Sequence, residues 1–223
     1  VQKQGNIYVM KLTNKDNRLT PATIPVLIQA MDEIEQDFLT IRQEDIKASK
    51  SLTGAALVTI GNGHIYSNGL DFELIMSGKI STTDFFENYY HQLCLRVLNL
   101  PFATVAAING HAFAGGMMLA LCHDYKVMRQ DRGFLCMPEI DLPSALSPGM
   151  MSILKTSVPN SKDLRDLILQ GKRISGKEAL DKGIVDAIEV ESKVLQSAMD
   201  IANKWADKVV GSKDIYKHLR LEM

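Results

Sequence analysis

The chain has 223 residues, a formal net charge of −1, 46% hydrophobic residues and 23% charged residues. This composition is typical of a soluble protein, and the near-zero charge argues against nucleic acid as a main partner. The length predicts one large α/β domain or at most two small ones, and no apolar run is long enough for a transmembrane helix. Apolar surroundings and the absence of metal-ligand spacing favour reduced core thiols for the three cysteines: Cys94, Cys122 and Cys136.

The first part of the chain predicts a strand, a helix, a loop and a second strand. Residues 7–12 are apolar and predict the first strand, and Thr20 with Pro21 predicts the N-cap and first position of a helix. The polar residues 41–53 predict a loop, and residues 55–60 predict a buried strand. Six apolar residues of the helix recur at helical spacing and predict a core-facing stripe: Ile24, Leu27, Ile28, Met31, Ile34 and Phe38.

An aromatic helix and a glycine-rich segment follow. Residues 81–98 predict a helix whose apolar stripe packs in the core or lines an apolar pocket. Its members are Phe85, Phe86, Tyr89, Tyr90, Leu93 and Val97. Pro101 ends this helix, and residues 103–107 predict a buried strand. Residues 107–125 then predict a turn and a buried helix that begins at Gly115 and Gly116.

Glycines at a helix start have two interpretations. The free N–H groups of the first turn and the helix dipole stabilise an anion, or an oxygen that becomes negative during a reaction. A second glycine turn, residues 67–71, supplies a further N–H donor at Leu70. Close packing of helix on strand explains Gly115 and Gly116 equally well, and the G-x-G-x-x-G spacing of dinucleotide-binding proteins is absent.

The rest of the chain predicts an α/β fold with much parallel pairing. Strands are predicted at residues 125–128 and 183–186, and a short apolar segment, 134–137, precedes Glu139. Because the residues around Glu139 are apolar, we expect its pKa to be raised. Helices are predicted over residues 147–156, 162–170, 176–182 and 192–210.

Four sequence blocks carry a resemblance to a known family. They are residues 66–71 (YSNGLD), 107–112 with 114–116 (AINGHA and AGG), 123–125 (HDY) and 137–140 (MPEI). Their order and spacing resemble the crotonase family, the enoyl-CoA hydratase and isomerase superfamily. The resemblance implies a spiral of ββα repeats over residues 1–190, followed by a C-terminal helical segment, 191–223, that is an incomplete trimerisation region. It also implies an acyl-CoA thioester substrate and a homotrimer or hexamer.

The resemblance assigns catalytic roles to three residues. The backbone N–H groups of Leu70 and Gly115 hold the thioester oxygen. Hydratases of this family typically use two glutamates, and here one is Glu139 while the other is replaced by Met118. A single glutamate suits a Δ3-Δ2-enoyl-CoA isomerase, in which one carboxylate takes a proton from C2 and returns it at C4.

Further substrate contacts are also expected from the resemblance. Asn68, Gly69, Gly116 and Met118 are predicted to contact the substrate, and Arg18 is predicted to contact the CoA moiety. The aromatic stripe of residues 81–98 is the candidate wall for the acyl tail. Structural roles are favoured for the two histidines that flank the central helix, His111 and His123.

The function predicted from the resemblance is isomerisation of 3-enoyl-CoA in the β-oxidation of unsaturated fatty acids. Within the family, the chain resembles most the monofunctional isomerases of the peroxisomal type. A peroxisomal location is therefore expected, with a mitochondrial one as the alternative. No cofactor is expected beyond the CoA of the substrate, and no nucleic acid or membrane span. Two alternatives stay open: an enoyl-CoA hydratase or other crotonase-type enzyme, and a non-catalytic acyl-CoA-binding protein.

Overall fold

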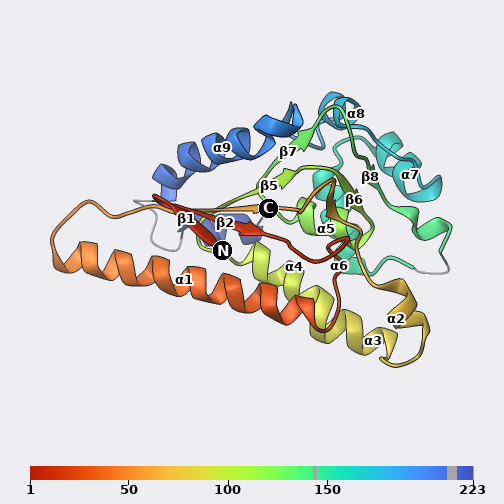
Figure 1. Ribbon diagram of the computed structural model, residues 1–223, viewed down its shortest axis with the longest axis horizontal. Helices are drawn as coiled ribbons and strands as arrows, with labels where there is room; N and C mark the ends of the chain where they lie inside the picture. Colours follow the sequence, from red (N-terminus) through yellow and green to blue (C-terminus); the bar gives the residue numbers. More distant parts are fainter. Residues whose placement is uncertain (143–144, 210–214, 223) are drawn as a thin grey trace.

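The computed structural model describes residues 1–142, 145–209 and 215–222. Its framework is a six-stranded sheet in the order β1-β2-β3-β5-β7-β9 (Figure 1). All neighbours pair in parallel except β1, which pairs antiparallel to β2. The strands are β1 Gln2–Gln4, β2 Ile7–Lys11, β3 Ala56–Ile60, β5 Ala103–Ile108, β7 Tyr125–Arg129 and β9 Ala187–Glu189.

A second sheet contains three short parallel strands in the order β4-β6-β8. They are β4 Ile65–Ser67, β6 His111–Phe113 and β8 Leu135–Cys136. Each short strand comes directly after a strand of the main sheet in the chain: β4 after β3, β6 after β5 and β8 after β7. The expected ββα repetition is therefore present.

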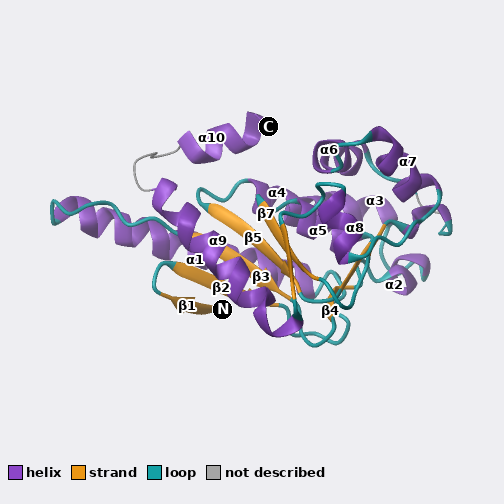
Figure 2. Cartoon of the chain, turned by 90° about the horizontal axis from the view of Figure 1, so that it is seen from above, coloured by secondary structure: helices purple, strands orange, loops and turns teal. Residues whose placement is uncertain are grey.

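Helices cover both faces of the main sheet (Figures 1 and 2). The bounds are α1 Thr23–Lys47, α2 Phe72–Met76, α3 Thr82–Phe85, η1 Phe86–Tyr90, α4 His91–Leu98, α5 Gly115–Leu121, η2 Pro138–Ile140, α6 Pro148–Ser157, α7 Ser161–Leu169, α8 Gly176–Asp181, η3 Glu191–Lys193, α9 Val194–Val209 and α10 Ile215–Glu222. The small side chains of α9 pack against one face, while α1, α4 and α5 contribute to the core on the other. Burial on both faces explains why the parallel strands are continuous apolar runs. No helix in the described ranges is both long and apolar enough to cross a membrane.

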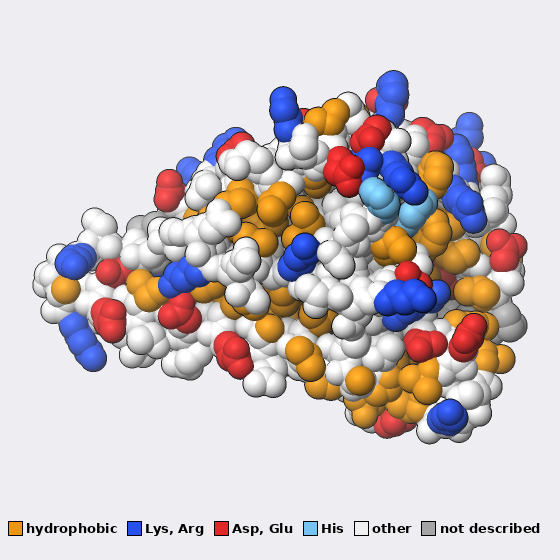
Figure 3. Space-filling model, in the orientation of Figure 1, with side chains coloured by type: hydrophobic (Ala, Val, Ile, Leu, Met, Phe, Trp, Pro, Cys, Tyr) orange, Lys and Arg blue, Asp and Glu red, His pale blue; other side chains and the backbone are white. Residues whose placement is uncertain are grey.

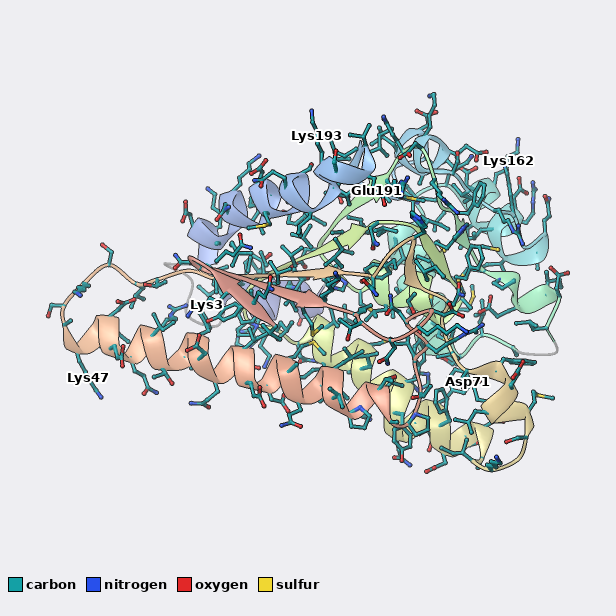
Figure 4. All side chains as sticks on the ribbon, in the orientation of Figure 1. Lys3, Lys47, Asp71, Lys162, Glu191 and Lys193 are labelled. Carbon is teal, nitrogen blue, oxygen red and sulfur yellow. The ribbon has the colours of Figure 1, made fainter. Side chains whose placement is uncertain are left out.

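Helix α1 differs from its predicted bounds. It begins at Thr23, although the Thr20 hydroxyl does accept hydrogen bonds from the N–H groups of Ala22 and Thr23 (3.2 and 3.1 Å). It continues to Lys47, which Figure 4 labels at its far end, so the predicted loop 41–53 is wrong over 41–47. Polarity misled this prediction, because Arg, Gln, Glu and Lys are good helix formers and no glycine or proline interrupts the segment.

The C-terminal third also differs in detail. The predicted strand 183–186 is wrong, because Ile184 and Val185 donate to the Ala179 carbonyl in the turn after α8, and the strand lies at β9. The helix predicted over 192–210 is confirmed as α9, while its predicted last residue, 210, lies outside the described residues. Helix α10 was not predicted. The division of the chain at residue 190 stays a prediction.

Helix α10 is attached to the core by a buried ion pair. The Arg220 Nε lies 2.6 Å from an oxygen of Asp124, and the two side chains are 7% and 14% exposed. Arg220 also donates to the Leu100 carbonyl and to the Thr104 hydroxyl, at 2.9 and 3.2 Å. The Tyr216 hydroxyl adds a hydrogen bond to Asp124 at 3.2 Å. These contacts hold α10 against the amino ends of β5 and β7.

Replacing Arg220 by alanine should leave the Asp124 carboxylate buried with its main partner removed. We expect Arg220→Ala to lower the free energy of unfolding by about 3 kcal/mol, measured by urea denaturation. Lys208→Ala, which truncates an exposed side chain at the end of α9, is the control and should change it by less than about 0.5 kcal/mol. Equal effects of the two substitutions would show that the ion pair does not hold α10.

Candidate active site

Three predicted catalytic groups lie at one edge of the small sheet. Leu70 follows β4, Gly115 follows β6 and Glu139 follows β8, each within a few residues of the strand's end. The carboxyl ends of parallel strands meet at the same edge of a sheet, which is where α/β proteins usually place their ligands. Asp71, labelled in Figure 4, marks the start of α2 directly after the first of these turns.

The Leu70 turn is bonded on one side only. The Leu19 N–H donates to the Gly69 carbonyl (2.9 Å), and the Asp71 N–H donates to the Leu19 carbonyl (3.3 Å). This parallel bridge leaves the N–H of Leu70 facing away from Leu19. We find no acceptor for it among the described residues. The group is therefore free to donate to a ligand.

The Gly115 turn is held in a strained conformation. Ala114 has φ 49° and ψ −122°, a combination that costs a non-glycine residue about 1–3 kcal/mol. Its N–H donates to the Cys136 carbonyl at 2.8 Å, which fixes the turn to β8. The buried Tyr90 hydroxyl donates to the Gly115 carbonyl at 2.9 Å. Gly115 is the first residue of helix α5, and its N–H has no acceptor in the described part of the chain.

Two glycines allow the Leu70 and Gly115 turns to touch. A Cβ on Gly69, whose φ is +74°, would lie 2.5 Å from the Phe113 carbonyl oxygen and 3.0 Å from the Gly115 nitrogen. A Cβ on Gly116 would overlap the Ser67 carbonyl. Both contacts are with backbone, which has little freedom to shift. The two interpretations of the glycine pair are therefore compatible: the glycines allow close packing, and the N–H groups beside them are free.

Glu139 is a buried carboxyl. Burial raises its pKa from 4.5 to about 7, partly offset by a hydrogen bond from its own backbone N–H. Its Oε2 atom is buried and has no hydrogen-bond partner within the described residues. The raised pKa predicted from the apolar neighbours of Glu139 is confirmed. Such a carboxyl is suited to exchange protons near neutral pH.

A cavity of about 270 Å³ is lined by Leu70, by Glu139 and, in the second turn, by Ala114 rather than Gly115. Its walls are largely apolar and aromatic, as is usual for small-molecule sites. The lining residues are Arg18, Asn68, Leu70, Phe72, Phe86, Phe113, Ala114, Pro138, Glu139, Leu142, Ala145 and Met150. Sequence reasoning missed Phe72, Phe113, Ala145 and Met150, which carry no motif of their own. In the aromatic stripe, Phe86 lines the cavity, whereas Phe85, Tyr90, Leu93 and Val97 are fully buried in the core.

Arg18 lies at the mouth of the cavity and supports the first turn. Its Nη1 donates to the carbonyls of Asn68 and Leu70, at 3.2 and 3.0 Å. Asn68 also lines the cavity, and its N–H donates to the Asp16 carbonyl at 3.0 Å. The contact of Arg18 with CoA stays a prediction. Its bonds to the turn were not foreseen, because they join residues about 50 positions apart.

Met118 is placed differently from the prediction. Its side chain is completely buried in the main hydrophobic core and is absent from the residues that line the cavity. Gly69 and Gly116 also lie outside this lining and act through packing. A residue of helix α5 at position 118 points into the core because α5 is apolar on every side.

No histidine or cysteine of the described residues lines the cavity. His123 is buried between the Thr59 hydroxyl and the Leu119 carbonyl, both at 2.9 Å, and burial lowers its pKa to about 3. The ring of His111 packs against Phe113 and Phe134. All three cysteines are buried free thiols. The described residues contain no cluster of three His, Cys, Asp or Glu side chains that could hold a metal ion.

Comparisons with known proteins agree with the geometry. A family model described as enoyl-CoA hydratase/isomerase matches residues 2–222. Enoyl-CoA delta isomerase 2, peroxisomal, of Arabidopsis thaliana is 32% identical, over 98% of this chain and 92% of that protein. Enoyl-CoA delta isomerase 3 of the same plant is 31% identical with the same coverage. The apo structure of an enoyl-CoA isomerase of Mycobacterium tuberculosis has a TM-score of 0.78 at 22% identity, over 99% of this chain and 88% of that one, which supports the fold.

The burial of Glu139 has a consequence for stability. Because the folded pKa lies above the unfolded one, this carboxyl contributes stability below pH 4.5 that is lost as the pH rises through about 7. We expect the free energy of unfolding of the wild type, relative to Glu139→Gln, to fall by roughly 2 kcal/mol across this window. Urea denaturation of both proteins at several pH values measures it.

Glu178 provides a control of opposite sign. Hydrogen bonds from the backbone and side chain of Ser175 lower its pKa, so its contribution is lost as the pH falls rather than as it rises. Relative to Glu178→Gln, the wild type should therefore become more stable with rising pH. A difference between wild type and Glu139→Gln that is independent of pH would contradict the burial of an unpaired carboxyl.

Proposed function

We propose that this chain, which belongs to the enoyl-CoA hydratase/isomerase family, is a Δ3-Δ2-enoyl-CoA isomerase with a one-glutamate proton shuttle. One observation carries the proposal: Glu139 is the single carboxylic acid among the described residues that line the cavity. The names of the two Arabidopsis relatives support the same activity.

The proposed reaction moves one proton and one double bond. The Glu139 carboxylate removes a proton from C2 of the 3-enoyl thioester, and the electron pair moves into a conjugated dienolate. The resulting carboxylic acid then protonates C4, which leaves the double bond between C2 and C3. Because C2 and C4 flank the same carbon, one carboxyl serves both steps and no second acid is required. No redox or metal cofactor is needed for this proton transfer.

The dienolate oxygen needs two hydrogen-bond donors already in place. We assign these to the N–H groups of Leu70 and Gly115, which are free of protein acceptors in the described residues and belong to turns in contact. Removal of one preorganised donor of this kind typically raises the activation barrier by about 3–4 kcal/mol. The bonds from Arg18 and Tyr90 to the carbonyls of the two turns support their orientation.

The raised pKa of Glu139 suits a shuttle. A base with a pKa of about 7 is partly deprotonated at neutral pH, and its conjugate acid readily returns the proton. The apolar walls leave few groups to compete for that proton. A hydratase would instead need an activated water and a second proton donor, and the family position for that donor holds the core residue Met118.

The location and assembly of the protein are part of the proposal. A peroxisomal location rests on the resemblance and on the names of two Arabidopsis relatives, enoyl-CoA delta isomerases 1 and 2. Imaging of a tagged full-length protein against peroxisomal and mitochondrial markers tests it. A homotrimer or hexamer is proposed from the resemblance alone. Light scattering coupled to size-exclusion chromatography separates these from a monomer.

Replacing Glu139 by glutamine removes the proposed shuttle while keeping the size of the side chain. We expect Glu139→Gln to lower the isomerisation rate of trans-3-hexenoyl-CoA by about 10²–10⁴-fold. The rise in absorbance of the conjugated enoyl thioester measures the rate. Binding of hexanoyl-CoA, measured by calorimetry, should persist in the variant.

Other outcomes separate the alternatives. Loss of the conjugated band from trans-2-hexenoyl-CoA in water would indicate a hydratase. Binding of acyl-CoA by the wild type without turnover of either substrate would indicate a binding protein. Full isomerase activity of Glu139→Gln would contradict the proposed shuttle.

The donor role of Leu70 is testable through its neighbour. A Cβ on Gly69 would press on the Phe113 carbonyl and displace the Leu70 N–H, so Gly69→Ala should lower kcat by about 10²–10³-fold. Gly78→Ala is a matched control, because Gly78 has a similar φ of +70° but open space around its Cβ position. Its kcat should equal that of the wild type. Equal losses in both variants would point to backbone strain rather than to the donor.

A further inference from the structure

Two hollows meet at one aromatic side chain. The cavity beside Glu139 and a second, more open hollow of about 430 Å³ share two lining residues, Phe86 and Ala145. The other residues that line the second hollow are Thr82, Thr83, Glu87, His91, Leu146 and Ser147. It lies toward the end of the molecule where α2 and α3 carry hydrophobic side chains at the surface (Figures 1 and 3). Phe86 therefore separates a partly enclosed space from a more open one.

The ring of Phe86 is held in position from several sides. It makes edge contacts with the rings of Phe85 and Tyr90, both with centroids 5.9 Å apart, and a tilted contact with His91 at 5.7 Å. The first two neighbours are fully buried. A wall made by such a side chain cannot swing aside without disturbing the core.

The helical segment that carries Phe86 has a local backbone irregularity that orients the Phe86 side chain. Residues 86–90 form a π turn, in which the His91 N–H donates to the Phe86 carbonyl. The wider turn brings Phe86 and His91 onto the same side of the helix, whereas five residues of regular α-helix rotate a side chain away. His91 in turn bonds the Ser147 hydroxyl at 3.0 Å, at the N-cap of α6. The ring is therefore backed by a bridge between two helices.

We propose that Phe86 is a specificity-determining residue that limits the length of the acyl chain. This inference rests on the proposed function, because it assigns the cavity beside Glu139 to the acyl part of the substrate. The cavity of about 270 Å³ lies just below the range of about 300–1,000 Å³ common for ligand sites. Short acyl groups fit in front of Phe86, and longer ones meet its ring.

The consequence for the wild-type protein is a preference for short 3-enoyl thioesters. A long chain must either displace the ring or leave terminal methylenes in water, and each methylene left exposed forgoes part of the binding energy. The hollow beyond Phe86 has apolar as well as polar lining, so it can receive a longer chain once the ring is removed. Selection by length is therefore expected to lie in the wall and not in the hollow behind it.

The test compares two substrates, trans-3-hexenoyl-CoA and trans-3-dodecenoyl-CoA. In the wild type kcat/KM should be higher for the hexenoyl substrate. Phe86→Ala should raise the dodecenoyl-to-hexenoyl ratio of kcat/KM by about tenfold or more, because it joins the two hollows. Phe86→Trp should lower this ratio, and it keeps the test decisive where the alanine variant fails to fold.

Phe72→Ala is the matched control, since Phe72 lines the same cavity but not the second hollow. Any loss in this variant should be similar for both chain lengths. A ratio unchanged in both Phe86 variants, or raised equally by Phe72→Ala, would overturn the proposal.

Binding separates this inference from the proposed function. The dissociation constants of hexanoyl-CoA and dodecanoyl-CoA, measured by calorimetry, should shift in favour of the longer chain in Phe86→Ala by the same factor as kcat/KM. If the wild type turns over neither enoyl substrate, the isomerase proposal fails, but this shift still supports the wall. Absence of this shift in the dissociation constants would overturn the proposed role of Phe86, whether or not the protein is an isomerase.

Discussion

The site depends on the parallel pairing of three very short strands. In the β4-β6-β8 sheet, Ala112 pairs with Ser67 on one side and Leu135 on the other. This register places the turns after the three strands side by side, so Leu70, Ala114 and Glu139 reach one cavity from segments far apart in the sequence. Two or three residues per strand provide few hydrogen bonds, and the sheet is also stabilised by burial of Tyr66, Ala112 and Leu135 in the main core.

Backbone strain and an unpaired carboxyl are concentrated where the chemistry is proposed. Ala114 has a positive φ, and the buried Oε2 of Glu139 has no partner among the described residues. Each feature costs stability by itself and persists because the surrounding structure over-determines it. The Cys136 carbonyl fixes Ala114, the Tyr90 hydroxyl fixes Gly115, and the buried side chains of Leu135 and Met137 hold the segment that carries Glu139. The favourable free energy of core packing thereby offsets the local cost of the strained Ala114 and the unpaired Glu139 carboxyl.

The helical region before β5 serves two purposes. Phe85 and Tyr90 complete the core, while Phe86, between them in the chain, faces the cavity. The π turn makes this division possible, because it changes the direction of side chains within one continuous helical segment. The aromatic stripe therefore serves both of its expected roles, core and pocket wall, with neighbouring residues taking different ones.

The sequence by itself determined four of the six strands of the main sheet, β2, β3, β5 and β7, as well as most helices, the glycine turns and the buried carboxyl. These features depend on local pattern: continuous apolar runs, helical spacing, and the apolar neighbours of Glu139. Only the tertiary structure decided the pairing of β4, β6 and β8, the burial of Met118 and the position of Phe86. Strands of two or three residues have no measurable period, and a π turn shifts the register that helical spacing assumes. Which residues face a shared cavity depends on contacts between distant segments, and no local pattern contains that information.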